Sequence, residues 1–280
     1  MTQDPQKLPR LGPAAFVNAS WGWREVPLPE YFAWSATHGL PRVEINAHPL
    51  SPEHLLHAQD PAVLSRIQSW ADEAGVQIVC VAGHNDFTSP DEGTQRAQLA
   101  RACFFVDAAQ ALDAPFVRLL SGGHRVDPLS AEVFPRLHRA FTEIGRYAEG
   151  RGVRIVIENH GGPTATGQRI ARIMEGVASP AVGLNYDPAN FLFQGTDPLM
   201  ALRYTLPWVI YSHWKDVRWE NGGPRLCPLG EGEIQWEPIV RTLLEAGYRG
   251  YWGIEHEEPS DIARGTLIGH AKLGALVGGA

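Results

Sequence analysis

Cysteine is scarce in this chain of 280 residues, and the three copies, Cys80, Cys103 and Cys227, lie far apart in the sequence. A small, odd and dispersed set forms neither a disulfide framework nor the paired cysteines of a structural zinc site. No run approaches the roughly 20 apolar residues that a helix needs to cross a bilayer, and residues 1–13 lack the apolar stretch of a signal peptide. These absences predict a protein of the reducing cytoplasm that does not contact a membrane.

Basic residues are in the minority, because 24 Lys and Arg face 31 Asp and Glu, which gives a formal net charge of −7. An acidic balance argues against nucleic acid as a partner, since a phosphate backbone attracts basic surfaces. The hydrophobic fraction of 44% and the charged fraction of 20% are those of an ordinary globular protein.

Linkers and glycine-rich dinucleotide motifs are also missing, and short apolar runs alternate with stretches of helical periodicity. Continuous apolar runs of this length are typical of parallel strands buried on both faces. The runs are residues 16–21, 42–46, 77–82, 116–120, 154–159, 182–187, 209–215 and 252–256. Eight strand–helix units predict a (β/α)8 TIM barrel, a single domain over residues 14–280 that follows a flexible tail at 1–13. An open doubly wound sheet is the alternative, which a G-x-G-x-x-G motif after the first run would favour.

Polar residues with metal-binding side chains stand at the ends of four consecutive apolar runs. They are Glu158, Asp187, His213 and Glu255, each about one strand–helix unit from the next. The carboxyl ends of barrel strands meet at one mouth, so these side chains are expected to converge. Carboxylates with one imidazole suit a divalent cation, and without a cation the carboxylates would repel one another. Solvated rim residues are the alternative, but charged groups are rarely buried unpaired.

Several motifs around these residues resemble those of a known family. The motifs are IENHGG (157–162), NYDPANF (185–191), SHWKDV (212–217), PLGEGEI (228–234) and GIEHE (253–257), with looser matches at VEIN (43–46) and AGHND (82–86). The chain resembles the xylose isomerase-like TIM-barrel superfamily and, within it, the sugar phosphate isomerase/epimerase branch.

The resemblance implies one divalent metal ion held by Glu158, Asp187, His213 and Glu255, with Mn²⁺ favoured over Co²⁺, Mg²⁺ or Zn²⁺. It also implies that Glu158 and Glu255 act as the acid/base pair while the metal polarises the carbonyl and stabilises the enediolate. The expected activity is that of an isomerase or epimerase of a sugar or small hydroxy-carbonyl compound, in carbohydrate metabolism. The expected partner is a small sugar or polyol-like substrate, and a homo-oligomer is left open.

Three other functions remain open on the same scaffold. A metal-dependent dehydratase of a keto-cyclitol or a dehydroshikimate-like acid would use the same metal and carboxylates. An apurinic-site endonuclease is more remote, because Asn190 stands where a histidine would extend its metal cluster and the net charge offers no electrostatic footprint for DNA. A binding barrel without catalytic activity is the last.

Three candidate substrate contacts lie on the strands that carry the expected metal ligands. His160 shares a strand face with Glu158, where it could bond a substrate hydroxyl or support a ligand. Lys215 could contact a substrate oxygen, or it could form an ion pair with Glu158 or Asp216. Arg218 is expected on the loop after the seventh strand, as an anion contact or as a solvated side chain.

Three further candidates lie on the first three strands. His84 could bind a hydroxyl or a second metal, or be a structural histidine. Glu44 is expected to point into the barrel, where it would orient a substrate or a basic side chain, or form a buried salt bridge. Trp21, at the end of the first strand, offers an aromatic face on which a sugar ring can stack.

Overall fold

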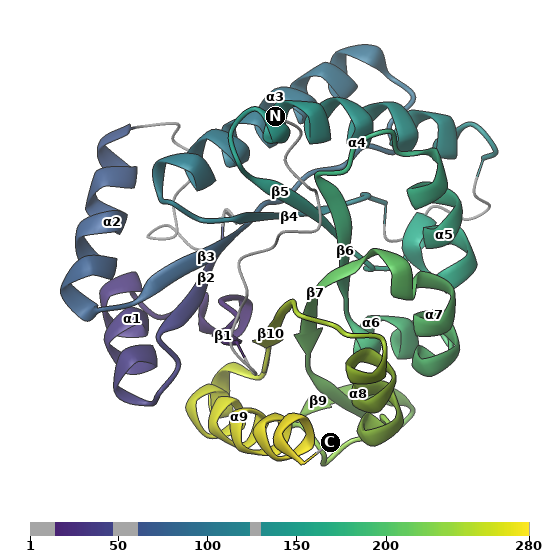
Figure 1. The fold of residues 1–280 in the computed structure, drawn as a ribbon. Helices are drawn as coiled ribbons and strands as arrows, with labels where there is room; N and C mark the ends of the chain where they lie inside the picture. Colours follow the sequence, from purple (N-terminus) through teal and green to yellow (C-terminus); the bar gives the residue numbers. More distant parts are fainter. Residues whose placement is uncertain (1–14, 47–60, 124–129, 280) are drawn as a thin grey trace.

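Eight parallel strands close a barrel in the computed structural model, which describes residues 15–46, 61–123 and 130–279 (Figure 1). The strands follow one another around the barrel in the order β1-β10-β7-β6-β5-β4-β3-β2. Their bounds are β1 Phe16–Asn18, β2 Arg42–Asn46, β3 Gln77–Ala82, β4 Phe116–Leu120, β5 Arg154–Glu158, β6 Val182–Tyr186, β7 Val209–Trp214 and β10 Tyr251–Ile254. The predicted TIM barrel is confirmed, and the predicted tail at 1–13 lies outside the described residues.

The helices surround the barrel and cover its outer face (Figure 1). They are α1 Leu28–Thr37, α2 Pro61–Ala74, α3 Glu92–Ala111, α4 Val133–Glu149, α5 Gly167–Gly176, α6 Pro188–Phe193, α7 Pro198–Thr205, α8 Trp236–Glu245 and α9 Ile262–Gly278. Local signals fix several starts: Asp91 accepts a hydrogen bond from the backbone N–H of Thr94, and Asp197 accepts one from that of Met200. Such side-chain caps satisfy N–H groups that have no partner inside a helix.

Aromatic rings fill the inside of the barrel. The ring centroids of Phe116 and Tyr211 lie 5.4 Å apart, and those of Phe116 and Tyr251 lie 5.7 Å apart. Because β4 is not a neighbour of β7 or β10, these rings meet across the interior. Side chains alternate between strand faces, so the residue two positions after Tyr211 points inward nearer the mouth, and this residue is His213. The aromatic rings of Phe116, Tyr211 and Tyr251 therefore lie directly beneath the polar mouth of the barrel.

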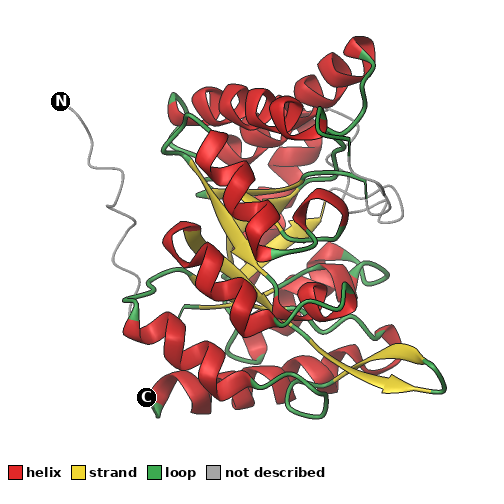
Figure 2. Cartoon of the chain, turned by 90° about the vertical axis from the view of Figure 1, so that its right-hand side faces the viewer, coloured by secondary structure: helices red, strands yellow, loops and turns green. Residues whose placement is uncertain are grey.

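A two-stranded hairpin follows β7, formed by β8 Asp216–Glu220 and β9 Gly223–Cys227. Asn221 and Gly222 both have positive φ, 52° and 81°, as a two-residue turn of this kind requires. Figure 2 shows this hairpin extending away from the barrel. The prediction that Arg218 lies on a loop after the seventh strand was wrong, because the Asn-Gly pair specifies a tight turn between two strands and Arg218 lies in the first of them.

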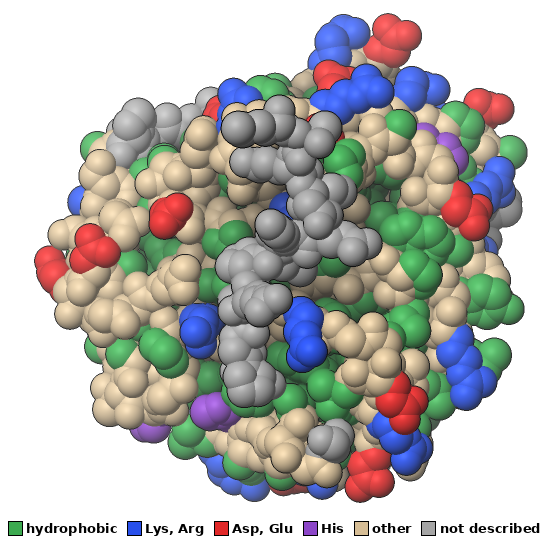
Figure 3. Space-filling view, viewed as in Figure 1, with side chains coloured by type: hydrophobic (Ala, Val, Ile, Leu, Met, Phe, Trp, Pro, Cys, Tyr) green, Lys and Arg blue, Asp and Glu red, His purple; other side chains and the backbone are tan. Residues whose placement is uncertain are grey.

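The surface is mixed in charge. On the face shown in Figure 3, acidic and basic side chains lie interspersed around the rim. Among the described residues, no helix combines the length and apolar character of a membrane span.

Candidate metal centre

The four expected metal ligands come together at the carboxyl ends of β5, β6, β7 and β10, which are neighbours in the barrel. Glu158 ends β5, His213 lies near the end of β7, and Asp187 and Glu255 directly follow β6 and β10. One ligand atom from each residue lies within 4.8 Å of the others, and all four residues are buried. This group could therefore hold a metal ion.

His213 stands at the centre of the group. Its Nδ1 atom lies 3.1 Å from Oε1 of Glu158 and 3.3 Å from Oε1 of Glu255, while its Nε2 atom lies 2.8 Å from Oε1 of Glu44. Burial alone would lower the pKa of His213, but Glu255, Glu44 and Glu158 outweigh burial and raise that pKa well above its usual value. A Cβ atom at Gly253, the residue paired with His213 on β10, would come within 2.9 Å of the ring. Only glycine leaves room for the imidazole there.

The two carboxylate oxygens of Asp187 make different contacts. Its Oδ1 atom accepts a hydrogen bond from the N–H of Asn190 at 3.1 Å and caps α6, while Oδ2 lies 3.0 Å from Nζ of Lys215. The Asn159 amide bonds the backbone of Asp187 on both sides, at 2.7 and 2.8 Å, which fixes the residue against β5. Burial raises the pKa of Asp187 to about 6, although Lys215 acts to lower it.

Lys215 is a buried cation surrounded by carboxylates. Its Nζ atom lies 2.8 Å from Oε2 of Glu255, contacts Asp187, and also bonds Glu257. One prediction from the sequence was an ion pair of Lys215 with Glu158 or Asp216. The partners in the structure are instead Asp187, Glu255 and Glu257, and strand alternation turns Asp216 away from the mouth. Burial alone would lower the pKa of Lys215, but Asp187, Glu255 and Glu257 raise it well above its usual value. Burial also raises the pKa of Glu257, to about 7, despite the opposing charge of Lys215.

Arg118 is the residue of this centre that sequence reasoning missed. It lies in the middle of β4, is 4% exposed, and places Nε 3.3 Å from Oε2 of Glu158. Burial would raise the pKa of Glu158, but Arg118 and His213 outweigh it and lower the pKa to about 2. An arginine inside an apolar strand is a usable signal, since a buried guanidinium needs a partner.

The charges of this region leave an excess that a divalent cation would reduce. Five carboxylates face two cations and an imidazole whose raised pKa favours its charged form, which leaves two negative charges if every carboxylate is ionised. A neutral, metal-binding imidazole would leave three, of which a divalent ion would cancel two. Three carboxylates and one imidazole also match the ligands that Mn²⁺, Co²⁺, Mg²⁺ and Zn²⁺ accept. The five carboxylates are those of Glu44, Glu158, Asp187, Glu255 and Glu257, and the two cations are Arg118 and Lys215.

A family model described as a xylose isomerase-like TIM barrel matches residues 32–272 of the chain. The chain belongs to this family. The inosose dehydratase of Bacillus thuringiensis is 26% identical over an alignment of 149 positions, which covers 47% of this chain and 50% of that protein. The chain thus spans about half the length of the curated relatives it matches.

Solved structures share the fold of this xylose isomerase-like barrel. A D-tagatose 3-epimerase-like protein is 20% identical with a TM-score of 0.78, covering 94% of this chain and 98% of that one. The IOLI protein, described with a bound zinc atom, is 16% identical with a TM-score of 0.79, covering 95% of this chain and 98% of that one.

The remaining predicted residues of the xylose isomerase-like barrel fall into two groups. Trp21 and His84 come together after β1 and β3, with ring centroids 5.7 Å apart and both side chains partly exposed. His160, also partly exposed, follows β5, where its backbone N–H bonds the Thr164 hydroxyl at 2.9 Å.

Arg218 lies elsewhere than predicted, whereas Glu44 points into the barrel as expected. Arg218 belongs to β8 rather than to a loop, and its Nε atom lies 2.7 Å from Oε1 of Glu220, with both side chains more than 40% exposed. Glu44 is 1% exposed and lies on the far side of the His213 ring from Glu158. Glu44 thus forms the buried ion pair that was one of its predicted alternatives, with His213, while Arg218 pairs with Glu220 away from the mouth.

Asp216 anchors the hairpin and the glycine-rich turn to β7. Its carboxylate accepts hydrogen bonds from the backbone N–H groups of Gly230 and Gly232, at 2.8 and 3.1 Å, and from the indole of Trp236 at 2.8 Å. A Cβ atom at position 232 would lie 2.1 Å from Oδ1 of Asp216. Gly232 is therefore required because it approaches a buried carboxylate closely. The same hydrogen bonds fix Asp216, which is the residue next to Lys215.

Replacing Asp216 with Asn is expected to lower the free energy of unfolding by about 3 kcal/mol, because an amide NH₂ would face buried N–H donors. Urea denaturation monitored by circular dichroism measures this loss. The matched control is Glu220→Gln, on the same hairpin, which breaks only a surface ion pair and should cost less than about 1 kcal/mol. Equal stability of the two variants would show that Asp216 is not an anchor.

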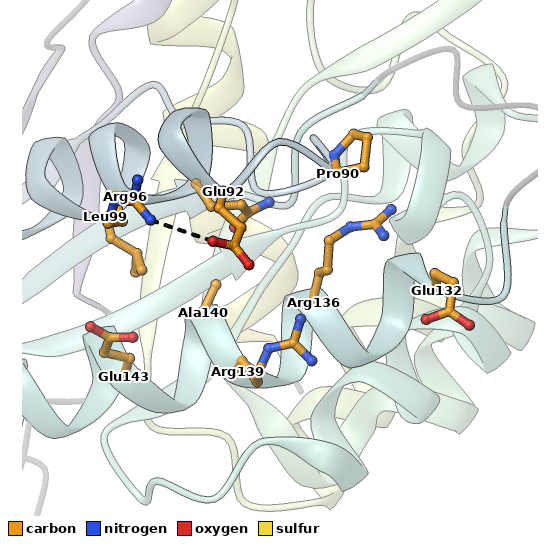
Figure 4. Close-up of a pocket in the computed structure, with 10 residues that line it drawn as sticks. Pro90, Glu92, Arg96, Leu99, Glu132, Arg136, Arg139, Ala140 and Glu143 are labelled. Atoms are coloured by element: carbon orange, nitrogen blue, oxygen red, sulfur yellow. Dashed lines mark ion pairs between the residues drawn. The ribbon is translucent and has the colours of Figure 1, made fainter.

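A second hollow, of about 370 Å³, lies outside the barrel between α3 and α4 (Figure 4). Its charged side chains balance one another, and Arg96 pairs with Glu92 at 3.7 Å. The charged residues that line it are Glu92, Arg96, Glu132, Arg136, Arg139 and Glu143. This hollow is lined by equal numbers of acidic and basic side chains, unlike the mouth, so its charge does not favour binding of an ion.

Proposed function

We propose that the protein is a divalent-metal-dependent isomerase or epimerase of a sugar or a small hydroxy-carbonyl compound. The observation that carries this proposal is that two carboxylates, Glu158 and Glu255, converge with Asp187 and His213, one ligand atom from each lying within 4.8 Å of the others. Both carboxylates approach the Nδ1 atom of His213, at 3.1 and 3.3 Å. The fold shared with a D-tagatose 3-epimerase-like protein supports the same activity.

The two carboxylates are held in the ionised form that a general base requires. Burial acts to raise their pKa values, but Arg118 lowers that of Glu158, and His213 and Lys215 lower that of Glu255. Both groups are therefore ionised at neutral pH, so either can take a proton from the carbon, and the other can return one after it has taken a proton from solvent. When bound, a divalent ion would polarise the substrate carbonyl. We propose Mn²⁺ first, with Co²⁺, Mg²⁺ or Zn²⁺ as substitutes.

Substrate recognition is proposed for the partly exposed residues of the mouth. Trp21 would stack on the apolar face of a sugar, and His84 and His160 would bond hydroxyl groups. Lys215 would reach a substrate oxygen from among its carboxylates. Because Arg218 is already paired with Glu220, we propose an unphosphorylated substrate.

A dehydratase of a keto-cyclitol or a similar acid is the second candidate, and Lys215 is the observation that favours it. In a dehydration a carboxylate would take the proton next to the carbonyl, the C–O bond at the next carbon would break, and the departing hydroxide would leave as water after receiving a proton. The Lys215 ammonium, held by Asp187 and Glu255 at 3.0 and 2.8 Å, could donate that proton. The matching relative from Bacillus thuringiensis is called an inosose dehydratase.

Reaction in deuterated water is expected to separate these activities. The panel comprises ketoses, ketose phosphates, hydroxypyruvate and inososes, incubated with the Mn²⁺-loaded protein. An epimerase incorporates one solvent deuterium at carbon in the recovered sugar, which mass spectrometry detects, whereas a dehydratase yields an enone that absorbs in the ultraviolet.

Removal of the metal is the matching control. Dialysis against a chelator should abolish the reaction, and Mn²⁺ or Co²⁺ should restore it. Undiminished turnover after chelation, or neither label nor enone with any substrate of the panel, would contradict the proposal.

A further inference from the structure

Glu44 reaches His213 from a distant strand of the barrel. Two strands, β1 and β10, separate β2 from β7 in the barrel order, so the contact crosses the interior. Oε1 of Glu44 lies 2.8 Å from Nε2 of His213, and the Tyr211 hydroxyl donates to the same oxygen at 2.6 Å. All three residues are buried beneath the mouth.

We propose that Glu44 is a positioning residue that selects which ring nitrogen of His213 faces the divalent ion. This inference rests on the proposed metal-dependent function. It departs from the expectation that Glu44 orients a substrate, and it agrees with the alternative that Glu44 forms a buried salt bridge.

The argument starts from the two forms of a neutral imidazole. One ring nitrogen carries a hydrogen and donates, while the other carries a lone pair and accepts. The Glu44 Oε1 atom accepts from the Tyr211 hydroxyl and acts as an acceptor towards the ring as well, so it requires the hydrogen to be on Nε2. The lone pair is then on Nδ1, the atom that lies 3.1 and 3.3 Å from Glu158 and Glu255.

Once an ion is bound, the other tautomer is disfavoured at both ends of the ring. Its Nε2 lone pair would face the Glu44 carboxylate without a hydrogen between them, in a buried place where unsatisfied polar atoms are costly. Its Nδ1 hydrogen would occupy the direction that a metal ion needs. Carboxylates that accept from the distal nitrogen of a ligating histidine fix the ring and increase its basicity, and their loss weakens metal binding.

The contact also fixes the ring orientation against the barrel wall. The imidazole lies against Gly253, where a Cβ atom would come within 2.9 Å of it. Glu44 holds one edge of the ring, and the wall restricts its rotation. The Nδ1 atom is thereby directed towards the mouth before an ion arrives.

Metal titration of Glu44→Gln tests this inference. The Gln amide is nearly the same size, but it is uncharged and its NH₂ can donate to Nε2, so it permits the wrong tautomer. We expect the dissociation constants for Zn²⁺ and Mn²⁺, measured by calorimetry, to rise by about 10- to 100-fold. The matched control is Tyr211→Phe, which removes the other donor to the same oxygen but leaves the carboxylate, and it should stay within about threefold of wild type.

A spectroscopic measurement on the wild-type protein needs no variant. With ¹⁵N-labelled histidine and Zn²⁺ bound, His213 should show a protonated Nε2 and a metal-bound Nδ1. Coordination through Nε2, or wild-type metal affinity in Glu44→Gln, would overturn the inference while leaving the proposed metal centre intact. Failure of the wild-type protein to bind any divalent ion would overturn both.

Discussion

Replacing Glu158 with Gln should lower kcat by at least about a thousandfold, because proton transfer by a positioned carboxylate alone contributes about 10²- to 10⁴-fold. The amide can neither accept the substrate proton nor supply the negative charge that a divalent ion needs. The same change leaves Arg118 facing an uncharged partner, since its Nε atom lies 3.3 Å from the Glu158 carboxylate. Initial rates with the substrate found in the panel measure the loss, and metal content measured on the same sample separates loss of the base from loss of the ligand.

Glu245→Gln is the matched control, because Glu245 is exposed at the end of α8 and the substitution is chemically identical. It should retain wild-type kcat. Full activity of Glu158→Gln would remove this residue from the acid/base pair and the metal ligands together.

Replacing Arg118 with Met should destabilise the ion-free protein by about 4 kcal/mol, as expected when one partner of a buried ion pair is removed. Met fills much of the same volume, so the cost arises from the Glu158 carboxylate left without its cation. Urea denaturation in the presence of a chelator measures the change in the free energy of unfolding. Adding Mn²⁺ should reduce the deficit, because the ion supplies positive charge beside the same carboxylate.

Arg154→Met provides the comparison. Arg154 also lies on a barrel strand, but among the described residues it has no carboxylate partner, and burial alone lowers its pKa. Its loss should cost less than about 1 kcal/mol, in the range of ordinary surface changes. If Arg118→Met costs no more than Arg154→Met, or costs the same with and without Mn²⁺, then Arg118 does not compensate the charge of Glu158.

The strands could be predicted because a buried parallel strand is a continuous apolar run. The runs at 42–46, 77–82 and 116–120 coincide with β2, β3 and β4. The polar residues included at the ends of later runs, such as Asp187 and Lys215, lie just past the strands. There the chain leaves the sheet and its side chains turn to the mouth. The polar residues at the ends of the runs made the predicted strands too long by one or two residues, but they also indicated where the candidate site lies.

Contacts across the barrel could not be predicted in the same way. Glu44 and His213 meet because the sheet closes, and no spacing along the chain encodes which inward residue of β2 faces which residue of β7. The same holds for Arg118 and Glu158, although a charge inside an apolar strand does indicate a buried partner. The hairpin after β7 carried a readable signal in Asn221 and Gly222, whereas the partners of Lys215 depend on the exact level of each strand end.

The uncompensated negative charge of the mouth connects the stability of the whole fold with the supply of metal. An ion that binds only the folded chain adds about 1.4 kcal/mol to the free energy of unfolding for each tenfold excess over its dissociation constant. The melting temperature of this barrel should therefore depend on the free ion concentration of its surroundings. In a cell short of the metal, the protein would lose abundance through unfolding and degradation as well as activity.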